Sequence, residues 1–208
     1  MSDKPTSVWL SRVLFESMLI MVSIVAALAL DEWRENRENE EMIEQALDNF
    51  LLEIRQNSER VEDAAPFNNG LRDVLVRRHA EGGITNVAEF VSVVESYSPS
   101  VLQSTAWDTA LATGALAKMD YEIVAALSLT YSMQNRYEQD VRNGTAELTS
   151  PQNLSADHLD LAVFNSIRYL NDVTRREAEL IAIFDEASAL IVRKRAPGDD
   201  DYSVVAVP

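Results

Sequence analysis

The stretch that decides the fold runs from Val13 to Leu30, VLFESMLIMVSIVAALAL, and contains one charged residue, Glu16. The charged stretch DEWRENRENEE follows at once. As a helix, these 18 residues extend about 27 Å, close to the roughly 30 Å hydrocarbon core of a bilayer. Glu16 lies in the first turn, where a carboxylate can reach interfacial water and avoids the cost of the bilayer centre. The stretch therefore predicts a membrane-spanning helix and a single-pass membrane protein.

Trp9 and Trp33 flank the stretch, and indole rings favour the headgroup zone of a bilayer. Two other interpretations stay open. Lys4 and Arg12 before the apolar run, with residues 27–29 (ALA) at its end, resemble a cleavable signal peptide. A buried core helix can also be this apolar, although such helices seldom exceed about 14 apolar residues. A retained span is favoured because no Pro or Gly breaks the apolar helix before the cleavage-like site and the helical period continues into Trp33.

Orientation is not decided by the flanking charges. Lys4 and Arg12 on one side balance Arg34 and Arg37 on the other, and carboxylates contribute little to the positive-inside rule. A short N-terminal segment (residues 1–12) followed by a long C-terminal part fits a signal anchor, so we expect the bulk of the chain on the periplasmic side.

The charge of the chain is strongly acidic. The net charge is -16, and residues 1–30 contribute nothing to it because two acidic residues there balance two basic ones. Such a surface repels phosphate backbones and anionic lipid headgroups, which argues against nucleic-acid binding. The partners expected are the lipid bilayer, through Val13 to Leu30, and a protein partner or a second copy of the chain.

The apolar residues beyond the span recur with a helical period nearly everywhere. We therefore predict an all-α fold: a short segment 1–12, a transmembrane helix 13–30, a soluble helical bundle domain 31–196 that begins with an amphipathic stalk, and a disordered acidic tail 197–208. The long bundle helices expected are the stalk, residues 120–142 and residues 156–194.

Turn and cap residues give the expected helix ends. The stalk should stop near residue 62, before Pro66, and a second helix should run from Leu71 to the glycines at 82–83. Thr85 or Asn86 should cap a third helix. Further along, Gly114 should end a short helix of small residues, Asp120 should cap the next one, and residues 143–144 (NG) should break it.

The N-terminal part combines Glu16 and the apolar run with residues 31–37 (DEWRENR) and residues 51–57 (LLEIRQN). With these motifs it resembles an uncharacterised bacterial family of single-pass membrane proteins. The segment 104–116 and the helix from Tyr121 to Tyr131 are similar to that family's middle region. The family has no assigned activity, so the resemblance implies topology and an all-α fold and implies no catalytic residue.

Residue patterns for chemistry are sparse. The chain has no Cys, and His79 and His158 stand far apart without metal-ligand spacing. No Gly-rich phosphate loop and no nucleophile elbow occurs. We therefore expect no catalytic residue, no metal site, no cofactor and no enzymatic activity.

The most informative polar position is Trp107 followed by Asp108, in a segment of small residues. Together with Tyr131 and Tyr137 they can line a ligand pocket, or Trp107 can simply anchor the core. Two functions follow: a membrane-tethered module that binds a protein partner through the stalk and the long C-terminal helix, or a ligand-sensing bundle that signals through a partner. Signal cleavage would instead leave a secreted helical domain.

Overall fold

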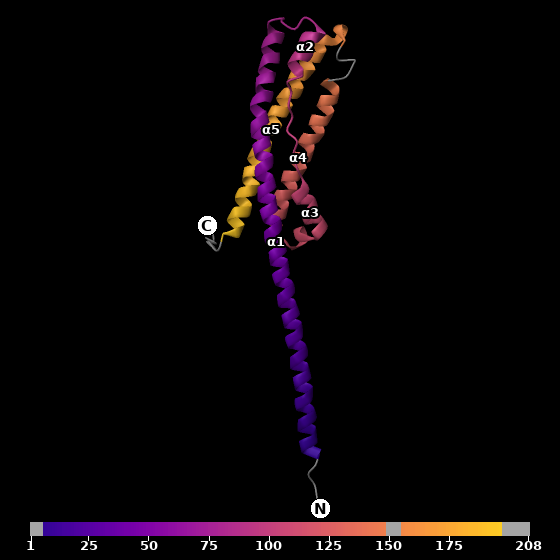
Figure 1. Ribbon diagram of the computed structural model, residues 1–208, viewed down its shortest axis with the longest axis vertical. Coiled ribbons are helices and arrows are strands. Elements are labelled where there is room, and N and C mark those ends of the chain that lie inside the picture. Colours follow the sequence, from indigo (N-terminus) through magenta and orange to yellow (C-terminus); the bar gives the residue numbers. More distant parts are fainter. Residues whose placement is uncertain (1–5, 149–154, 197–208) are drawn as a thin grey trace, which may run out of the picture. The chain divides into compact units, whose positions relative to one another are not determined.

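The computed structural model describes the backbone of residues 6–148 and 155–196 and the side chains of residues 12–146 and 155–196. Over these ranges the protein is all-α and contains no strand (Figure 1). The elements in chain order are α1 (Thr6–Ala80), α2 (Val87–Val94), α3 (Thr105–Thr113), η1 (Ala115–Lys118), α4 (Tyr121–Leu148), η2 (Ala156–His158) and α5 (Leu159–Arg195). The predicted fold class is confirmed, and the predicted tail lies outside the described residues.

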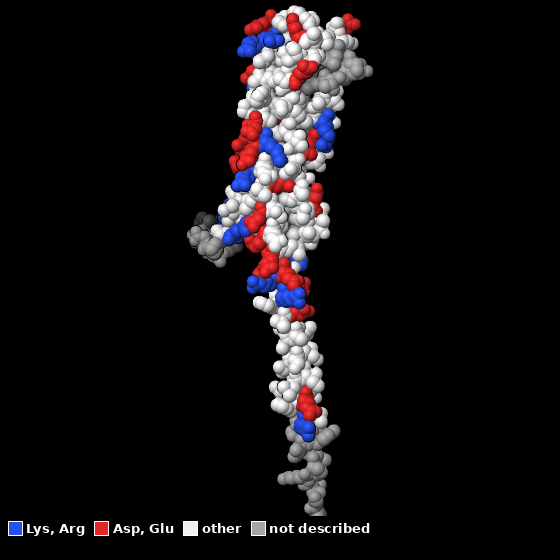
Figure 2. All heavy atoms as spheres, viewed as in Figure 1, with Lys and Arg blue, Asp and Glu red and all other residues white. Residues whose placement is uncertain are grey.

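The chain divides into two units, Met1–Gln45 and Ala46–Pro208, and α1 contributes to both. The predicted soluble domain, residues 31–196, thus includes a stretch, 31–45, that groups with the N-terminal unit. In the first unit, the apolar part of α1 forms a white band in Figure 2, bounded at both ends by charged side chains. Among the described residues, this is the one helix whose length and composition suit a membrane crossing. None of its apolar window is buried, so it is not a core helix within this chain.

In the second unit, α1, α4 and α5 pack through stripes that alternate three- and four-residue steps, the spacing of coiled coils. In Figure 1, α4 and α5 lie side by side and run in opposite directions. The buried stripe of α1 consists of Leu47, Phe50, Ile54, Asn57, Val61, Asn68, Leu71 and Leu75. That of α4 includes Ile123, Leu127, Thr130, Gln134 and Tyr137, and that of α5 Val163, Ser166, Leu170, Val173, Glu177, Leu180, Phe184, Ala187 and Ile191.

The prediction that the stalk ends near residue 62 is wrong, because α1 continues through Pro66 to Ala80. Proline removes one helical hydrogen bond and crowds the preceding turn, which costs about 3 kcal/mol. Val61 before it, and Leu71 and Leu75 after it, are buried in the same stripe. Their burial holds the two halves in one helix.

The predicted break at residues 143–144 is also wrong, because α4 continues to Leu148. Gly144 is buried, and a Cβ there would overlap the ring of Tyr169 on α5. Glycine therefore serves close helix packing at this position rather than chain reversal.

The predicted caps are confirmed. The side chain of Asn86 accepts a hydrogen bond from the Glu89 amide at the start of α2. Asp120 Oδ1 accepts from the Glu122 amide at 2.8 Å at the start of α4. Gly114, with φ 77°, ends α3 in the left-handed conformation that glycine adopts without strain.

Candidate functional site

A row of polar side chains is buried along the inner face of α1, where the stripe would ordinarily be apolar. Glu53, Asn57 and Asn68 are at most 6% exposed. Buried polar groups are costly unless they are hydrogen-bonded, and polar residues at such positions fix the register of packed helices.

Glu53 ties α1 to both α3 and α4. Its Oε1 accepts a hydrogen bond from the Tyr131 hydroxyl at 2.7 Å, and its Oε2 accepts from the Ala106 amide at 3.0 Å. Burial raises the pKa of Tyr131, and the nearby Glu53 carboxylate raises it further. Tyr131 therefore stays a neutral hydroxyl that donates to Glu53, and α3 is held at its first turn.

Asn57 organises the loop before α3. Its Nδ2 donates to the Gln103 carbonyl at 2.8 Å and to Gln134 Oε1 at 3.1 Å, while its Oδ1 accepts from the Gln103 amide at 3.0 Å. Arg60 Nη1 donates to the same Oδ1 at 3.0 Å. One side chain thus links α1, α4 and the connecting loop.

Asn68 and Glu177 form the third group. Asn68 Nδ2 donates to Glu177 Oε1 at 2.7 Å, and the Tyr137 hydroxyl donates to the same oxygen at 3.2 Å. Burial raises the pKa of the Glu177 carboxyl, and the hydrogen bonds from Asn68 and Tyr137 oppose this to a smaller extent. Asn68 Oδ1 and Glu177 Oε2 have no hydrogen-bond partner among the described residues.

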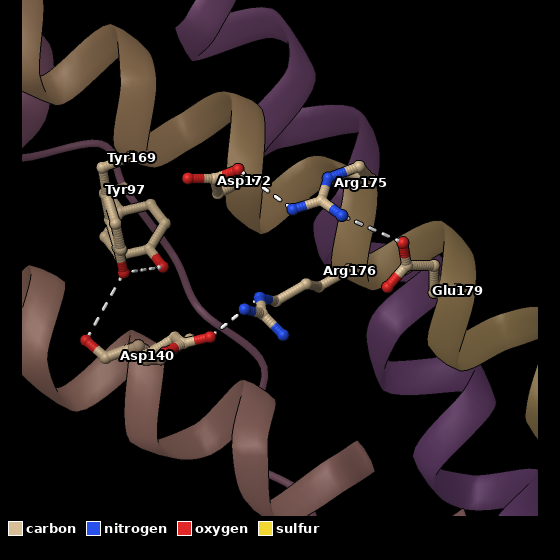
Figure 3. Close-up of polar contacts among 8 residues, drawn as sticks. Tyr97, Asp140, Tyr169, Asp172, Arg175, Arg176 and Glu179 are labelled. Atoms are coloured by element: carbon tan, nitrogen blue, oxygen red, sulfur yellow. Dashed lines mark hydrogen bonds and ion pairs between the residues drawn. The ribbon is translucent and has the colours of Figure 1, made fainter.

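A tyrosine pair closes the adjoining part of the bundle (Figure 3). The hydroxyls of Tyr97, in the loop after α2, and Tyr169, on α5, lie 2.7 Å apart, and their rings meet edge-on with centroids 5.7 Å apart. Burial raises the pKa of both hydroxyls. This pair connects the α2 loop to the close contact between Gly144 and Tyr169.

Arginines on α5 form the ion pairs drawn in Figure 3. Arg176 Nε lies 2.8 Å from Asp140 Oδ2 on α4 and so joins two helices. Arg175 pairs with Asp172 and Glu179 along α5 itself, at 3.1 Å and 3.3 Å. These exposed intrahelical pairs contribute little stability.

The candidate ligand residues Trp107, Asp108 and Tyr131 are brought together by the fold. They line one hollow of about 360 Å³ between α3 and α4. The ring centroids of Trp107 and Tyr131 lie 5.5 Å apart, with an interplanar angle of 32°. The remaining lining residues are polar: Ser104, Ser128, Ser132, Gln134, Asn135 and Glu138. Tyr137 does not line this hollow; it is 1% exposed and donates to Glu177 instead.

A second and larger hollow, of about 640 Å³, is an open groove between α1 and α5. Its floor includes Leu51, Ile54 and Phe184. The charged residues that line it are Asp48, Arg55, Glu59, Glu62 and Asp185, so four carboxylates face one guanidinium. Asp48 is also paired with Arg195 at the end of α5, at 2.7 Å.

The interface residues Trp9 and Trp33 both lie within α1; Trp33 is exposed, and the side chain of Trp9 is outside the described residues. His79 lies 3.6 Å from Asp160, and His158 Nδ1 lies 2.9 Å from Ser155 Oγ. In the described part of the chain, His and carboxylate side chains form no cluster that suits a metal ion.

The buried polar residues were missed by the sequence analysis, although a signal exists. Asn57 stands between Ile54 and Val61, and Glu177 between Val173 and Leu180, at the spacing of the apolar stripe. Read as members of the stripe, they are predicted to be buried.

Comparisons with protein families, with curated proteins and with solved structures found no match to this chain.

Proposed function

We propose that this protein is a membrane-tethered interaction module. In this proposal, Val13 to Leu30 anchors the chain as a single span, and the helical bundle binds a protein partner. The observation that carries the proposal is the groove between α1 and α5, which combines an apolar floor with an acidic rim. The resemblance to a bacterial family of single-pass proteins supports the same topology.

The partner proposed for the groove is an amphipathic helix with a basic flank. Its apolar face would cover Leu51 and the half-exposed Leu52, as helices do in hydrophobic grooves. Lys or Arg on its flank would face Glu59, Glu62 and Asp185. Charge complementarity of this kind steers association and selects the partner.

The groove is tested by site-specific photocrosslinking in native membranes. A photoreactive residue at Ser188, in the groove, should give one discrete adduct, and the same residue at Ala125, on the exposed face of α4, should give none. The adduct should lose at least tenfold intensity in the double variant Glu59→Lys/Glu62→Lys and should weaken with added salt. Adducts of equal intensity at Ser188 and Ala125, or an adduct whose intensity does not change on charge reversal, would contradict the partner proposal.

A crosslink between two copies of the chain would make the groove a homo-oligomer interface and overturn the basic-helix partner. The mass of the crosslinked adduct distinguishes a second copy from another protein, because an adduct of two copies has twice the mass of the chain. If only one of the two copies carries the charge reversal, a basic rim would face an acidic one, and the adduct would gain rather than lose intensity.

We propose that the span is a retained signal anchor and that the bundle lies in the periplasm. Protease treatment of sealed cells and spheroplasts, with a tag at the C-terminus, tests the orientation. Carbonate extraction followed by N-terminal sequencing tests retention. A soluble fragment beginning near Leu30 would mean a secreted helical domain, and protection of the tag in spheroplasts would mean a cytoplasmic bundle.

A second candidate function is ligand sensing. The hollow lined by Trp107 and Tyr131 favours it, since its volume of about 360 Å³ lies at the lower end of the usual range for small-molecule pockets. A sensing bundle would pass its signal to a separate partner. Ligand binding in that hollow does not depend on the groove.

A further inference from the structure

The hollow between α3 and α4 has an aromatic wall. Trp107 and Tyr131 both line it, with their ring centroids 5.5 Å apart. The faces of Trp and Tyr rings carry negative electrostatic potential and attract cations within about 6 Å. Two such rings at one hollow are a feature of sites that hold organic ammonium groups.

The wall is held in place before any ligand arrives. The Tyr131 hydroxyl donates to Glu53 Oε1, and the amide of Ala106, next to Trp107, donates to Glu53 Oε2. The Phe50 ring also packs near Tyr131, with ring centroids 5.9 Å apart. A preorganised wall binds a ligand without the entropic cost of ordering its side chains.

The charges at the hollow are negative. Asp108 and Glu138 line it, Glu53 lies behind Tyr131, and no Lys or Arg is among the described lining residues. Arg142 approaches Glu138 at 3.7 Å. Asp108 accepts a hydrogen bond from Ser104 at 3.3 Å and has no basic partner among the described residues. One exposed carboxylate that lines the hollow therefore has no basic partner among the described residues.

We propose that this hollow binds a small organic cation, with its ammonium group against the rings of Trp107 and Tyr131 and its charge balanced by Asp108. Hydroxyls and amides of Ser128, Ser132 and Asn135 line the same hollow and can bind a polar substituent of the ligand. A bare divalent ion fits less well, because it needs about six oxygen ligands in a compact shell.

The proposal is tested by isothermal titration of the full-length protein in detergent micelles. The probes are choline, spermidine, and 3,3-dimethylbutan-1-ol, the uncharged isostere of choline. We expect at least one of the two cations to bind with one-site stoichiometry, and the uncharged isostere to bind at least tenfold more weakly than choline if choline is that cation. Absence of binding by both cations, or equal binding of choline and its isostere, would overturn the proposal.

Substitutions at two positions locate the site. Asp108→Asn removes the uncompensated charge from an exposed position and should weaken binding at least fivefold, with unchanged thermal melting. Trp107→Phe keeps an aromatic ring with a weaker quadrupole and should weaken binding by a smaller factor than Trp107→Leu. The matched controls are Asp63→Asn on α1 and Tyr121→Leu on α4, both exposed and outside the hollow.

The controls should bind as the wild type does. If Asp63→Asn weakens binding as much as Asp108→Asn, the cation is attracted by the overall charge of the chain and the proposed site is wrong. The titrations probe the hollow and the crosslinks probe the groove, so the two results are independent. Failure of the partner proposal and failure of the cation site are therefore distinguishable.

Discussion

Asn68 on α1 and Glu177 on α5 are fully buried and are joined by a 2.7 Å hydrogen bond from Asn68 Nδ2 to Glu177 Oε1, although they stand 109 residues apart in the sequence. A proton on Glu177 Oε2 would supply a donor to a pair that otherwise leaves Asn68 Oδ1 and Glu177 Oε2 unsatisfied. Burial also raises the pKa of Glu177, which favours the protonated carboxyl group. The two helices therefore meet at a carboxyl group whose protonation affects the stability of the bundle.

The first prediction concerns pH. The folded-state pKa of Glu177 is raised, so the folded chain binds the proton more tightly than the unfolded chain does. The stabilisation of the folded state by this proton is fully present below the ordinary glutamate pKa. It is lost as the pH rises through the raised pKa of the folded state, at about 1.4 kcal/mol per pH unit between the two pKa values. Glu177→Gln should remove that loss, as measured by urea unfolding in micelles from pH 5 to pH 9.

Its control is Glu179→Gln, which removes the same charge from an exposed position two residues away. That variant should keep the wild-type pH dependence. Identical pH profiles for wild type and Glu177→Gln would contradict the role assigned to the Glu177 proton.

The second prediction concerns Asn57. Asn57→Leu should lower the free energy of unfolding by about 3 kcal/mol, because Gln134 and the Gln103 backbone lose their partners in a partly buried layer. Asn69→Leu removes a hydrogen bond to the Ala65 carbonyl within α1 and should cost less than about 1 kcal/mol. Equal losses in urea unfolding would mean that the inter-helix layer contributes nothing beyond local helix effects.

The third prediction concerns two helical glycines. Gly144→Ala should destabilise the bundle by about 1–3 kcal/mol, because the new Cβ overlaps the Tyr169 ring. Gly70→Ala meets no atom within 4 Å and should stabilise by about 0.5–1 kcal/mol through helix propensity. Thermal melting separates the two signs. In the Tyr169→Ala background, the penalty of Gly144→Ala should largely disappear.

The fourth prediction concerns the proline within α1. Pro66→Ala restores a helical hydrogen bond and should raise the free energy of unfolding by about 1–3 kcal/mol. Pro99→Ala, in the loop between α2 and α3, should instead be slightly destabilising because it frees the unfolded chain. If Pro66→Ala destabilised the protein, α1 would not be continuous at this position.

The sequence alone predicted the all-α class, a cap at Thr85 or Asn86, the cap at Asp120, the helix end at Gly114 and the course of α5, because these depend on local backbone chemistry and on the 3.6-residue period. It also placed Trp107, Asp108 and Tyr131 as candidate pocket residues. It went wrong at Pro66 and Gly144, where local rules predict a helix end.

Only the tertiary structure decided those two positions and the polar interior. Burial of Val61, Leu71 and Leu75 on both sides of Pro66 outweighs the lost hydrogen bond, and Gly144 is where the Tyr169 ring approaches α4. The partners of Asn57 and Glu177 come from distant segments, and no local pattern names them. Periodicity fixes which face of a helix is buried, whereas the identity of the atoms facing it depends on how separate helices pack.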